Sequence, residues 1–341
     1  MSSNLNSHFR SVESALFFSR GDALDPRLGD LSKALPELNA PKDLFAELKA
    51  VGQTGNEERT FVLAGYPDDE GIRLNGGRLG ASQGPREIRR ALYKMTPSLY
   101  QTRPSSTLLD IGDLSWSPDT SGAQSLLGRH QAVSEYAEAA LKAGASWIGL
   151  GGGHDYGFAD ASAFCRWAKS EGHKPLVINF DAHLDVRPFD GKPTSGTPFF
   201  RMLEEYPETE FAEIGIQGHC NSRSHLEWAR ARGARVLTQE EIETSGEPMV
   251  TVVTRFLGDL LLRPRPVFIS IDIDGFSSAV APGCSQSWAT GFMPADFFPV
   301  LSLLSYRLNV RILGIYEVSP ALDADLRTAK LAAQIIHRVI S

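Results

Sequence analysis

The sequence predicts an α/β fold, a three-layer α/β/α sandwich around a mostly parallel sheet of about eight strands. Short apolar runs recur along the chain and alternate with longer amphipathic stretches, as expected of repeated strand–helix units. Several runs are apolar at almost every position, which is typical of parallel strands covered by helices on both faces. Polar side chains that can bind metals follow three of these runs directly, at the edge where open α/β sheets bind ligands.

Each apolar run marks one expected strand, and the stretch after it marks the helix that crosses back over the sheet. The expected strands cover residues 60–65, 107–111, 146–150, 177–180, 211–217, 235–237, 266–274 and 310–316. The expected helices cover residues 84–92, 125–142, 156–171, 198–203, 248–262, 294–306 and 324–339, with one more through Leu226 and Trp228. Pro85 stands in the first turn of the first helix, where its missing N–H is not needed. The loop at 68–80 is too polar and glycine-rich to form a strand.

The length of 341 residues suits one large α/β domain. Residues 1–55 mix short apolar pieces with prolines and carry no recognisable chemistry, so we expect an N-terminal extension that packs on the domain. Residues 56–341 are expected to form a single catalytic domain. No internal repeat and no linker rich in Pro, Gly or Ser divides them.

Composition and charge exclude several classes of protein. A net charge of −7 and a pI near 5.7 favour neither nucleic acid nor an anionic membrane as a partner. The three cysteines, Cys165, Cys220 and Cys284, are scattered and lack zinc-site spacing, which fits a reducing compartment. The N-terminus has no leader pattern, and no run approaches the ~20 apolar residues of a membrane helix. We therefore expect a cytoplasmic protein.

The stretch that carries the clearest chemistry follows the strand at 177–180. Asp181, His183 and Asp185 alternate with Ala182 and Leu184. Because alternate residues of an extended chain share a face, the three polar side chains can converge while the other two point away. A polar loop after a strand would explain one such residue, but three alternating metal ligands favour a site.

Two further strand ends offer matching side chains. Asp272 and Asp274 end the strand expected at 266–274, and two like charges on one face are costly to bury unless a cation lies between them. His154 follows the strand at 146–150 after three glycines, which allow a sharp turn and a close approach of the backbone. No Lys-Ser/Thr pair follows the glycines, so a phosphate-binding P-loop is not indicated.

The ligand types predict the metal and the reaction. The six candidates include four carboxylates, two imidazoles and no thiolate, a mixture that suits Mn²⁺ better than structural zinc or Ca²⁺. Six ligands are too many for one catalytic ion that keeps an open position, so we expect two ions bridged by carboxylates. Such a pair can lower the pKa of a bound water to ~7, which predicts metal-assisted hydrolysis.

These segments together resemble the signatures of the ureohydrolases, the family of arginases, agmatinases and formimidoylglutamases. The matching blocks are Gly-Gly-Gly-His-Asp (151–155), Asp-Ala-His-Leu-Asp (181–185), Ser-Ile-Asp-Ile-Asp (270–274), Ala-Pro-Gly (281–283) and Glu-Val-Ser-Pro (317–320). The resemblance implies the arginase fold with a binuclear manganese site. It places His154, Asp181, Asp185 and Asp272 on one ion, and Asp181, His183, Asp272 and Asp274 on the other. It also implies a homo-oligomer, a trimer or a hexamer.

The resemblance assigns the substrate side as well. Glu317 matches the glutamate that holds the NH₂ groups of an amidine or guanidine, and Asp185 would orient the attacking hydroxide and take up its proton. Arg187 stands where arginases carry a neutral Asn, and with Ser195 and Gly196 it fits the formimidoylglutamase pattern Arg-(x)-Ser-Gly-Thr-Pro-Phe. An Arg there can bind a substrate carboxylate through two hydrogen bonds. Asn221, which follows the strand at 211–217, is a further candidate for the pocket lining.

The expected reaction is hydrolysis of N-formimidoyl-L-glutamate to L-glutamate and formamide, a step of histidine degradation. The first alternative is a guanidino hydrolase that releases urea from agmatine or guanidinobutyrate. A non-catalytic arginase-like protein is less favoured because all six ligand positions are filled. A deacetylase would need a His-His pair, which does not occur in the sequence.

Overall fold

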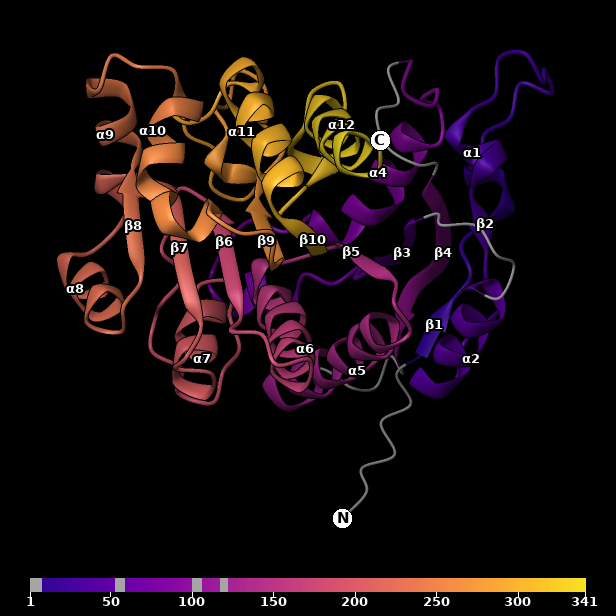
Figure 1. The fold of residues 1–341 in the computed structure, drawn as a ribbon, viewed down its shortest axis with the longest axis horizontal. Coiled ribbons are helices and arrows are strands. Elements are labelled where there is room, and N and C mark those ends of the chain that lie inside the picture. Colours follow the sequence, from indigo (N-terminus) through magenta and orange to yellow (C-terminus); the bar gives the residue numbers. More distant parts are fainter. Residues whose placement is uncertain (1–7, 53–58, 100–105, 117–121) are drawn as a thin grey trace.

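The computed structural model describes residues 8–52, 59–99, 106–116 and 122–341. Its strands are β1 (His8–Arg10), β2 (Lys33–Ala34), β3 (Arg59–Gly65), β4 (Ser106–Ser115), β5 (Ser146–Leu150), β6 (Leu176–Phe180), β7 (Glu210–Ile216), β8 (Arg235–Thr238), β9 (Pro266–Asp272) and β10 (Asn309–Tyr316). They form one sheet in the order β1-β4-β3-β5-β10-β9-β6-β7-β8, with β2 beside β4 (Figure 1). The expected three-layer α/β/α fold is confirmed, and all eight expected strands are present as β3 to β10.

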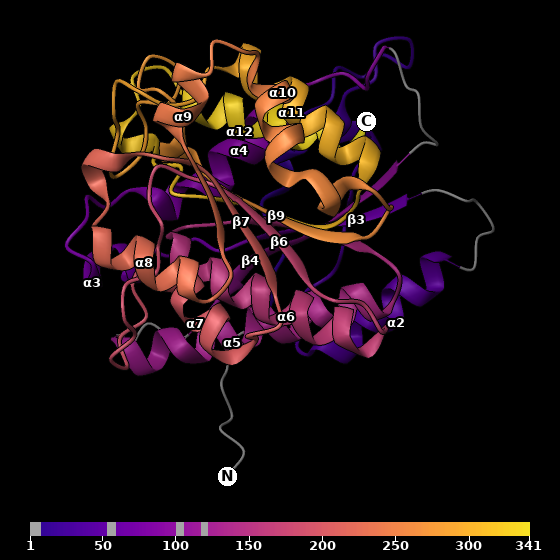
Figure 2. The ribbon, with the colours of Figure 1, turned by 60° about the vertical axis from the view of Figure 1, so that its left-hand side comes forward.

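Two helical layers enclose this sheet (Figures 1 and 2). One layer contains α2 (Pro41–Gly52), α5 (Ala123–Lys142), α6 (Gly157–Ser170) and α7 (Pro198–Glu205). The opposite layer contains α4 (Gly84–Leu92), α10 (Met249–Leu257), α11 (Pro294–Arg307) and α12 (Arg327–Ile340). The remaining helices are α1 (Leu28–Leu31), α3 (Glu70–Leu74), α8 (Arg223–Ala231) and α9 (Gln239–Thr244). A separate apolar cluster fills the space between the sheet and each layer.

The centre of the sheet explains the apolar runs of the sequence. Every residue of β5, β6 and β9 is buried, because helices cover both faces of these strands. The neighbouring pairs β5–β10, β10–β9 and β9–β6 are all parallel. Their carboxyl ends therefore meet at one edge of the sheet, which is where the polar motifs of the sequence emerge.

The N-terminal segment is part of this sheet. β1 pairs antiparallel with β4, and β2 pairs parallel with it. Phe9 is fully buried and makes edge-on contacts with the rings of Tyr136 and Trp147, at centroid distances of 5.0 and 6.2 Å. The expected boundary at residues 55 and 56 lies outside the described residues. The described part of the first 52 residues thus contributes an edge strand as well as a packing surface.

Two local features differ from the expectation. The loop at 68–80 begins with the short helix α3, whose five residues were not expected to be helical. The helix expected over 248–262 ends as an α-helix at Leu257, because Gly258 takes a positive φ of 48° and a 3-10 turn follows. Neither difference moves a polar motif away from the sheet edge.

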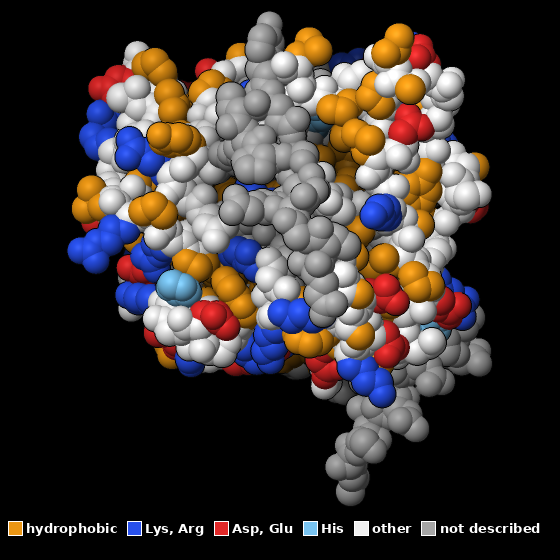
Figure 3. Space-filling model, turned by 45° about the vertical axis from the view of Figure 1, so that its right-hand side comes forward, with side chains coloured by type: hydrophobic (Ala, Val, Ile, Leu, Met, Phe, Trp, Pro, Cys, Tyr) orange, Lys and Arg blue, Asp and Glu red, His pale blue; other side chains and the backbone are white. Residues whose placement is uncertain are grey.

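Charged residues of both signs share the surface. On the face drawn in Figure 3, Lys and Arg side chains are interspersed with Asp and Glu. Within the described ranges, no helix combines the length and apolar character needed to cross a membrane.

A buried ion pair joins α4 to β4 and offers a test of stability. The fully buried Arg89 donates to both carboxylate oxygens of Asp110, at 2.8 and 3.0 Å, and to Asp113 at 2.6 Å. Arg89→Met leaves two carboxylates without their cation, so we expect the free energy of unfolding to fall by about 3–5 kcal/mol in urea titrations. Arg90→Met removes an exposed ion pair with Glu87 on the same helix. This variant should change the free energy of unfolding by less than about 1 kcal/mol. Equal effects of the two changes would contradict this assignment.

Candidate metal centre

Four of the six candidate ligands come from the ends of three central strands. Asp181 follows β6, Asp272 is the last residue of β9, and Asp274 lies in the 3-10 turn after it. His154 begins the 3-10 turn that follows β5 and its three glycines. All four side chains are buried, with at most 3% of their surface exposed. The parallel sheet thus gathers residues far apart in the sequence at one point.

The first group surrounds the Nδ1 atom of His154. This atom lies 3.1 Å from Asp181 Oδ2, 3.0 Å from Asp185 Oδ2 and 3.2 Å from Asp272 Oδ2. One atom from each of the four residues can therefore reach a single cation. Three carboxylates and one imidazole form a donor set that suits a hard or intermediate divalent ion.

The second group consists of Asp181, His183 and Asp274. His183 Nδ1 lies 3.5 Å from Asp181 Oδ1 and 3.1 Å from Asp274 Oδ2. Asp181 belongs to both groups, with one oxygen facing each, as a bridging carboxylate would. Asp272 belongs to the first group by this geometry, and its other oxygen accepts a hydrogen bond from the backbone N–H of Asp274.

The donors fit two divalent cations. His154 Nδ1 and Asp274 Oδ1 are buried and form no hydrogen bond within the described chain. Burial, and then the charges of Asp274 and Asp181, raise the pKa of Asp272 well above its ordinary value. Burial likewise raises the pKa of Asp274 to about 7, against the opposing effect of His183. Without cations, the carboxylates of Asp181, Asp185, Asp272 and Asp274 repel one another. Two doubly charged ions would balance their four negative charges.

Neighbouring groups fix the orientation of the donors. His154 Nε2 lies 2.9 Å from the hydroxyl of Ser270, which leaves Nδ1 to face the carboxylates. The ring of His154 stacks on Tyr316 with a centroid distance of 4.7 Å and meets Phe199 edge-on. The Asn179 amide donates to Asp181 Oδ2 at 3.2 Å. Contacts of this kind hold a metal-binding imidazole in one tautomer and one orientation.

The two residues expected to be catalytic have an unusual backbone. Asp185 has a φ of 47° and Glu317 a φ of 64°, in the left-handed region that side chains other than Gly, Asn and Asp rarely adopt. Such a conformation costs about 1–3 kcal/mol and persists only when the surroundings enforce it. The backbone N–H of Glu317 donates to Gly152 O at 2.8 Å, and its Oε1 accepts from the backbone N–H of His154 at 3.1 Å. The glycine loop therefore holds Glu317 beside the first group.

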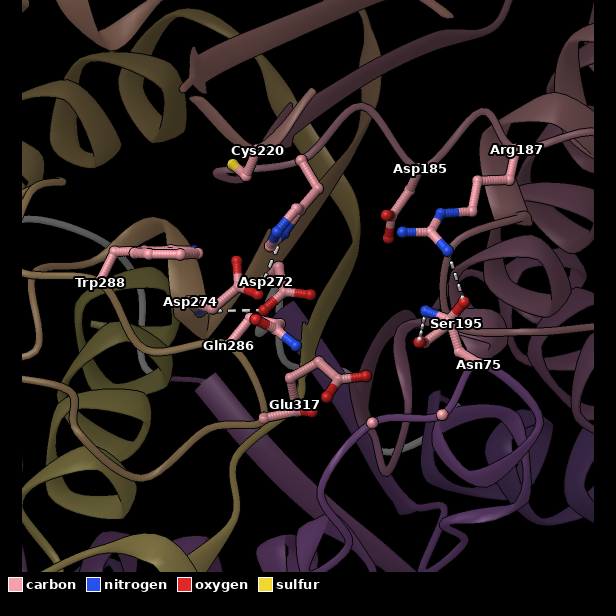
Figure 4. A pocket seen from close by; sticks show the side chains of 14 residues that line it. Asn75, Asp185, Arg187, Ser195, Cys220, Asp272, Asp274, Gln286, Trp288 and Glu317 are labelled. Carbon is pink, nitrogen blue, oxygen red and sulfur yellow. Dashed lines mark hydrogen bonds and ion pairs between the residues drawn. The ribbon is translucent and has the colours of Figure 1, made fainter. Parts of the chain in front are cut away.

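A cavity of about 210 Å³ opens over these residues (Figure 4). Its lining consists of Asn75, Gly76, Gly77, His183, Asp185, Arg187, Ser195, Cys220, Asp272, Asp274, Ser285, Gln286, Trp288 and Glu317. In Figure 4, Arg187 and Asn75 lie at one side and Trp288 at the other, while Glu317 reaches in below Asp272. The cavity therefore joins the expected metal ligands to Arg187 and Glu317.

Arg187 is held in place by residues from two loops. Its Nη1 donates to Asn75 Oδ1 at 3.0 Å, and the Asn75 amide donates to the hydroxyl of Ser195 at 2.9 Å. A Cβ atom on Gly196 would come within 2.8 Å of Arg187 Cδ, so only glycine leaves room for this side chain. Ser195 thus lies at the cavity, whereas Gly196 packs against Arg187 from outside it.

Asn221 has a different position from the other candidates. Its Oδ1 accepts from the backbone N–H of Leu184 at 2.9 Å, and its amide donates to Ala182 O and Gln217 O at 2.8 Å each. All its main hydrogen-bonding groups are therefore used to hold the turn that carries His183. Asn221 borders a second hollow next to the metal cavity, but we infer that it acts through the position of this turn.

Sequence reasoning missed Asn75 as a site residue. It follows the last residue of α3, in the loop that was expected only to be too polar and glycine-rich for a strand. Its hydrogen bonds join it to residues more than 100 positions away in the chain, and no local sequence pattern predicts such contacts. Gln286 and Trp288 were not among the expected site residues either, and both line the cavity.

The fold and the site define an α/β protein with a carboxylate-rich centre for two metal ions. The model of the arginase family matches residues 59–341. The formimidoylglutamase of Ralstonia nicotianae is 32% identical over 287 residues, which cover 82% of this chain and 84% of that protein. The chain therefore belongs to the arginase family.

Solved structures agree with this placement. The crystal structure of Trypanosoma cruzi formiminoglutamase with Mn²⁺ is 26% identical, covers 93% of this chain and 97% of that one, and superposes with a TM-score of 0.74. The formimidoylglutamase of Bacillus subtilis shares the fold, with a TM-score of 0.77 at 24% identity, and covers 95% of this chain and 93% of that one.

Proposed function

We propose that this protein hydrolyses N-formimidoyl-L-glutamate to L-glutamate and formamide at a centre of two Mn²⁺ ions. The observation that carries the proposal is the position of Arg187 in the same cavity as Asp185 and Glu317. A guanidinium in the same cavity as the candidate metal ligands suits a substrate that carries a carboxylate next to its amidine. It would repel the amine of agmatine. Relatives named formimidoylglutamase, such as the one from Ralstonia nicotianae, support the same substrate.

The residues of the two groups would hold the ions. His154, Asp181, Asp185 and Asp272 would hold the first ion, and Asp181, His183 and Asp274 would hold the second. The family pattern adds Asp272 to the second ion as well. When bound, two such ions supply a Lewis acid and lower the pKa of water in the cavity. Asp185 accepts the proton of the attacking water at its carboxylate. Glu317 accepts hydrogen bonds from the two amidine nitrogens and balances their positive charge.

Burial and the charge of Asp272 raise the pKa of Glu317 well above its ordinary value, and a cation beside it reverses that shift. An amidinium substrate is such a cation, so Glu317 binds the protonated amidine better than a neutral analogue. Arg187, which Asn75 holds in place, binds the carboxylate end of the substrate.

The proposal is tested with a panel of substrates and manganese-loaded protein. Formamide released from N-formimidoyl-L-glutamate, with no urea from agmatine or guanidinobutyrate, is the expected result. Urea from either guanidino compound at a higher kcat/KM would instead assign the protein to the guanidino hydrolases. No release from any compound, with both metals bound, would favour a non-catalytic family member.

Arg187→Ala should lower kcat/KM for formimidoylglutamate by about tenfold to a hundredfold. A charge-assisted hydrogen bond is worth ~1.5–3 kcal/mol, and ~1.4 kcal/mol corresponds to tenfold. The loss should appear mainly in KM, because the carboxylate is bound in the ground state and the transition state alike. Lys192→Ala, an exposed change in the same loop, serves as the control. An unchanged KM in the Arg187 variant, with metal content intact, would make Arg187 a structural residue only.

We also infer a cytoplasmic homo-oligomer, a trimer or a hexamer. The support is the family resemblance together with the reduced cysteines, none of which forms a disulfide in the described chain. Light scattering of the purified protein measures the oligomeric state directly.

A further inference from the structure

A cavity of about 560 Å³ lies among α5, α6 and α7. It shares no lining residue with the metal cavity or with the hollow beside Asn221. These three helices cover one face of the sheet, below it in Figure 1. Its polar lining includes His130, Ser134, Ser162, Arg166, Arg201 and Glu205. A volume of this size is typical of small-molecule sites, which are largely preformed and carry a few oriented polar groups.

Arg201 is a cation that interacts with the charges of Glu205 and Asp155 but forms no direct ion pair with either among the described residues. In the described part of the chain it forms no ion pair, and its one hydrogen bond joins Nη1 to His130 Nδ1 at 3.2 Å. Its guanidinium instead stacks on two aromatic rings. Arg201 Cζ lies 3.5 Å from the ring centroid of Phe158 and 4.8 Å from that of Phe189. Burial lowers the pKa of Arg201 to about 10, so the group stays charged at neutral pH. A partly buried charge of this kind is stabilised by an anion.

Glu205 lies four residues after Arg201 on α7, at a spacing that usually allows an ion pair on a helix. No such pair is present among the described residues, although both side chains line the cavity. One Glu205 oxygen accepts from the hydroxyl of Tyr206 at 2.7 Å. Among the described residues, the cavity thus presents a guanidinium and a carboxylate that form no direct ion pair with each other.

The remaining polar residues are already paired. Arg166 binds Glu138 at 2.7 Å and donates to Ser162 and Ser134 at 2.8 and 2.9 Å. These bonds fix the two hydroxyls in the wall of the cavity. With Glu135 and Glu138 also in the lining, a multiply charged anion such as phosphate would be repelled.

We propose that this cavity binds a free amino acid, with its carboxylate on Arg201 and its ammonium group on Glu205. A zwitterion binds both of these groups at once and adds no net charge to the acidic lining. A carboxylate can accept two parallel hydrogen bonds from the guanidinium, which still has free N–H groups.

The same guanidinium connects the cavity to the substrate loop. Phe189, on which it stacks, lies two residues after Arg187. A bound carboxylate competes with the ring for the charge of Arg201 and weakens the hold on this loop. Occupancy of the cavity should therefore loosen residues 186–197, and tight binding of substrate by the loop should in turn weaken amino-acid binding.

Calorimetric titration of the full-length, manganese-loaded protein tests the site with L-alanine, acetate and inorganic phosphate. We expect saturable binding of L-alanine, at least tenfold weaker binding of acetate and no detectable binding of phosphate. Absence of saturable L-alanine binding, or phosphate binding as tight as that of L-alanine, would overturn the proposal. The readout is binding and not turnover, so its failure is separate from failure of the proposed reaction.

Variants locate the binding. Arg201→Gln should weaken L-alanine at least tenfold, whereas Arg232→Gln should not, although Arg232 also stacks on an aromatic ring, that of Trp228. Glu205→Gln should weaken L-alanine but not acetate, and this exposed change decides the matter if the Arg201 variant does not fold. If Arg187→Ala lost L-alanine binding while Arg201→Gln kept it, the ligand would lie in the metal cavity and the assignment would be overturned.

Hydrogen exchange tests the connection to the substrate loop. L-alanine at a concentration that just saturates the wild type should speed amide exchange in peptides covering 186–197, and the same concentration should speed it less in Glu205→Gln. Equal exchange with and without L-alanine would overturn the coupling.

Discussion

Asp272→Asn is expected to remove at least one metal ion and to reduce hydrolysis by about a thousandfold or more. The change keeps the shape of the side chain, and the Asn Oδ1 can still accept the hydrogen bond from the backbone N–H of Asp274. It removes the charge that faces His154 Nδ1 at 3.2 Å. Metal ions contribute several kcal/mol to the stabilisation of such transition states, and each 1.36 kcal/mol corresponds to tenfold in rate. Elemental analysis and formamide release measure the two losses.

The same variant should not lower the stability of the metal-free protein. Asp272 is buried among like charges, so its ionised form is costly when no cation is present. We expect the melting temperature of the metal-free variant to equal or exceed that of the metal-free wild type. Asp190→Asn, an exposed change in the substrate loop, should leave metal content, rate and melting temperature unchanged. Full manganese occupancy and a near-normal rate in the Asp272 variant would rule out its role as a ligand.

Glu317→Gln is expected to lower kcat/KM by about thirtyfold to a few thousandfold while both metals stay bound. Glu317 is buried and belongs to neither ligand group, so the change should leave metal content intact. Truncating one partner of a buried, hydrogen-bonded charge pair costs about 2–5 kcal/mol, which gives this range of rates. The amide can still accept the hydrogen bond from the backbone N–H of His154, so the glycine loop should keep its position.

The Glu317 variant separates two roles of this residue. Loss of metal together with activity would show that Glu317 supports the metal centre. Loss of activity toward the amidine, with metal content and melting temperature unchanged, would place it on the substrate. A rate within threefold of the wild type would exclude both roles.

The sequence alone predicted the strands β3 to β10 and proposed the six candidate metal ligands at the strand ends, but it did not predict β1 and β2. Strands such as β6 and β9 are buried throughout and mostly apolar because helices cover both faces, and this pattern can be read from consecutive residues. The ligands follow the same strands directly, so the rule that parallel strands end at one edge places them together. His154, Asp181 and Asp272 follow three different strands, and the structure places one oxygen of each carboxylate within 3.2 Å of His154 Nδ1.

Tertiary structure alone decided the surroundings of these ligands. Asn75 reaches Arg187 across 112 positions of the chain, and Arg201 meets His130 across 71. The left-handed backbone of Glu317 depends on its contacts with the glycine loop and not on the preference of a glutamate. The physical reason is that strands and their end residues follow from local patterns of burial. The partners of a loop side chain depend instead on how distant loops pack, which no local pattern encodes.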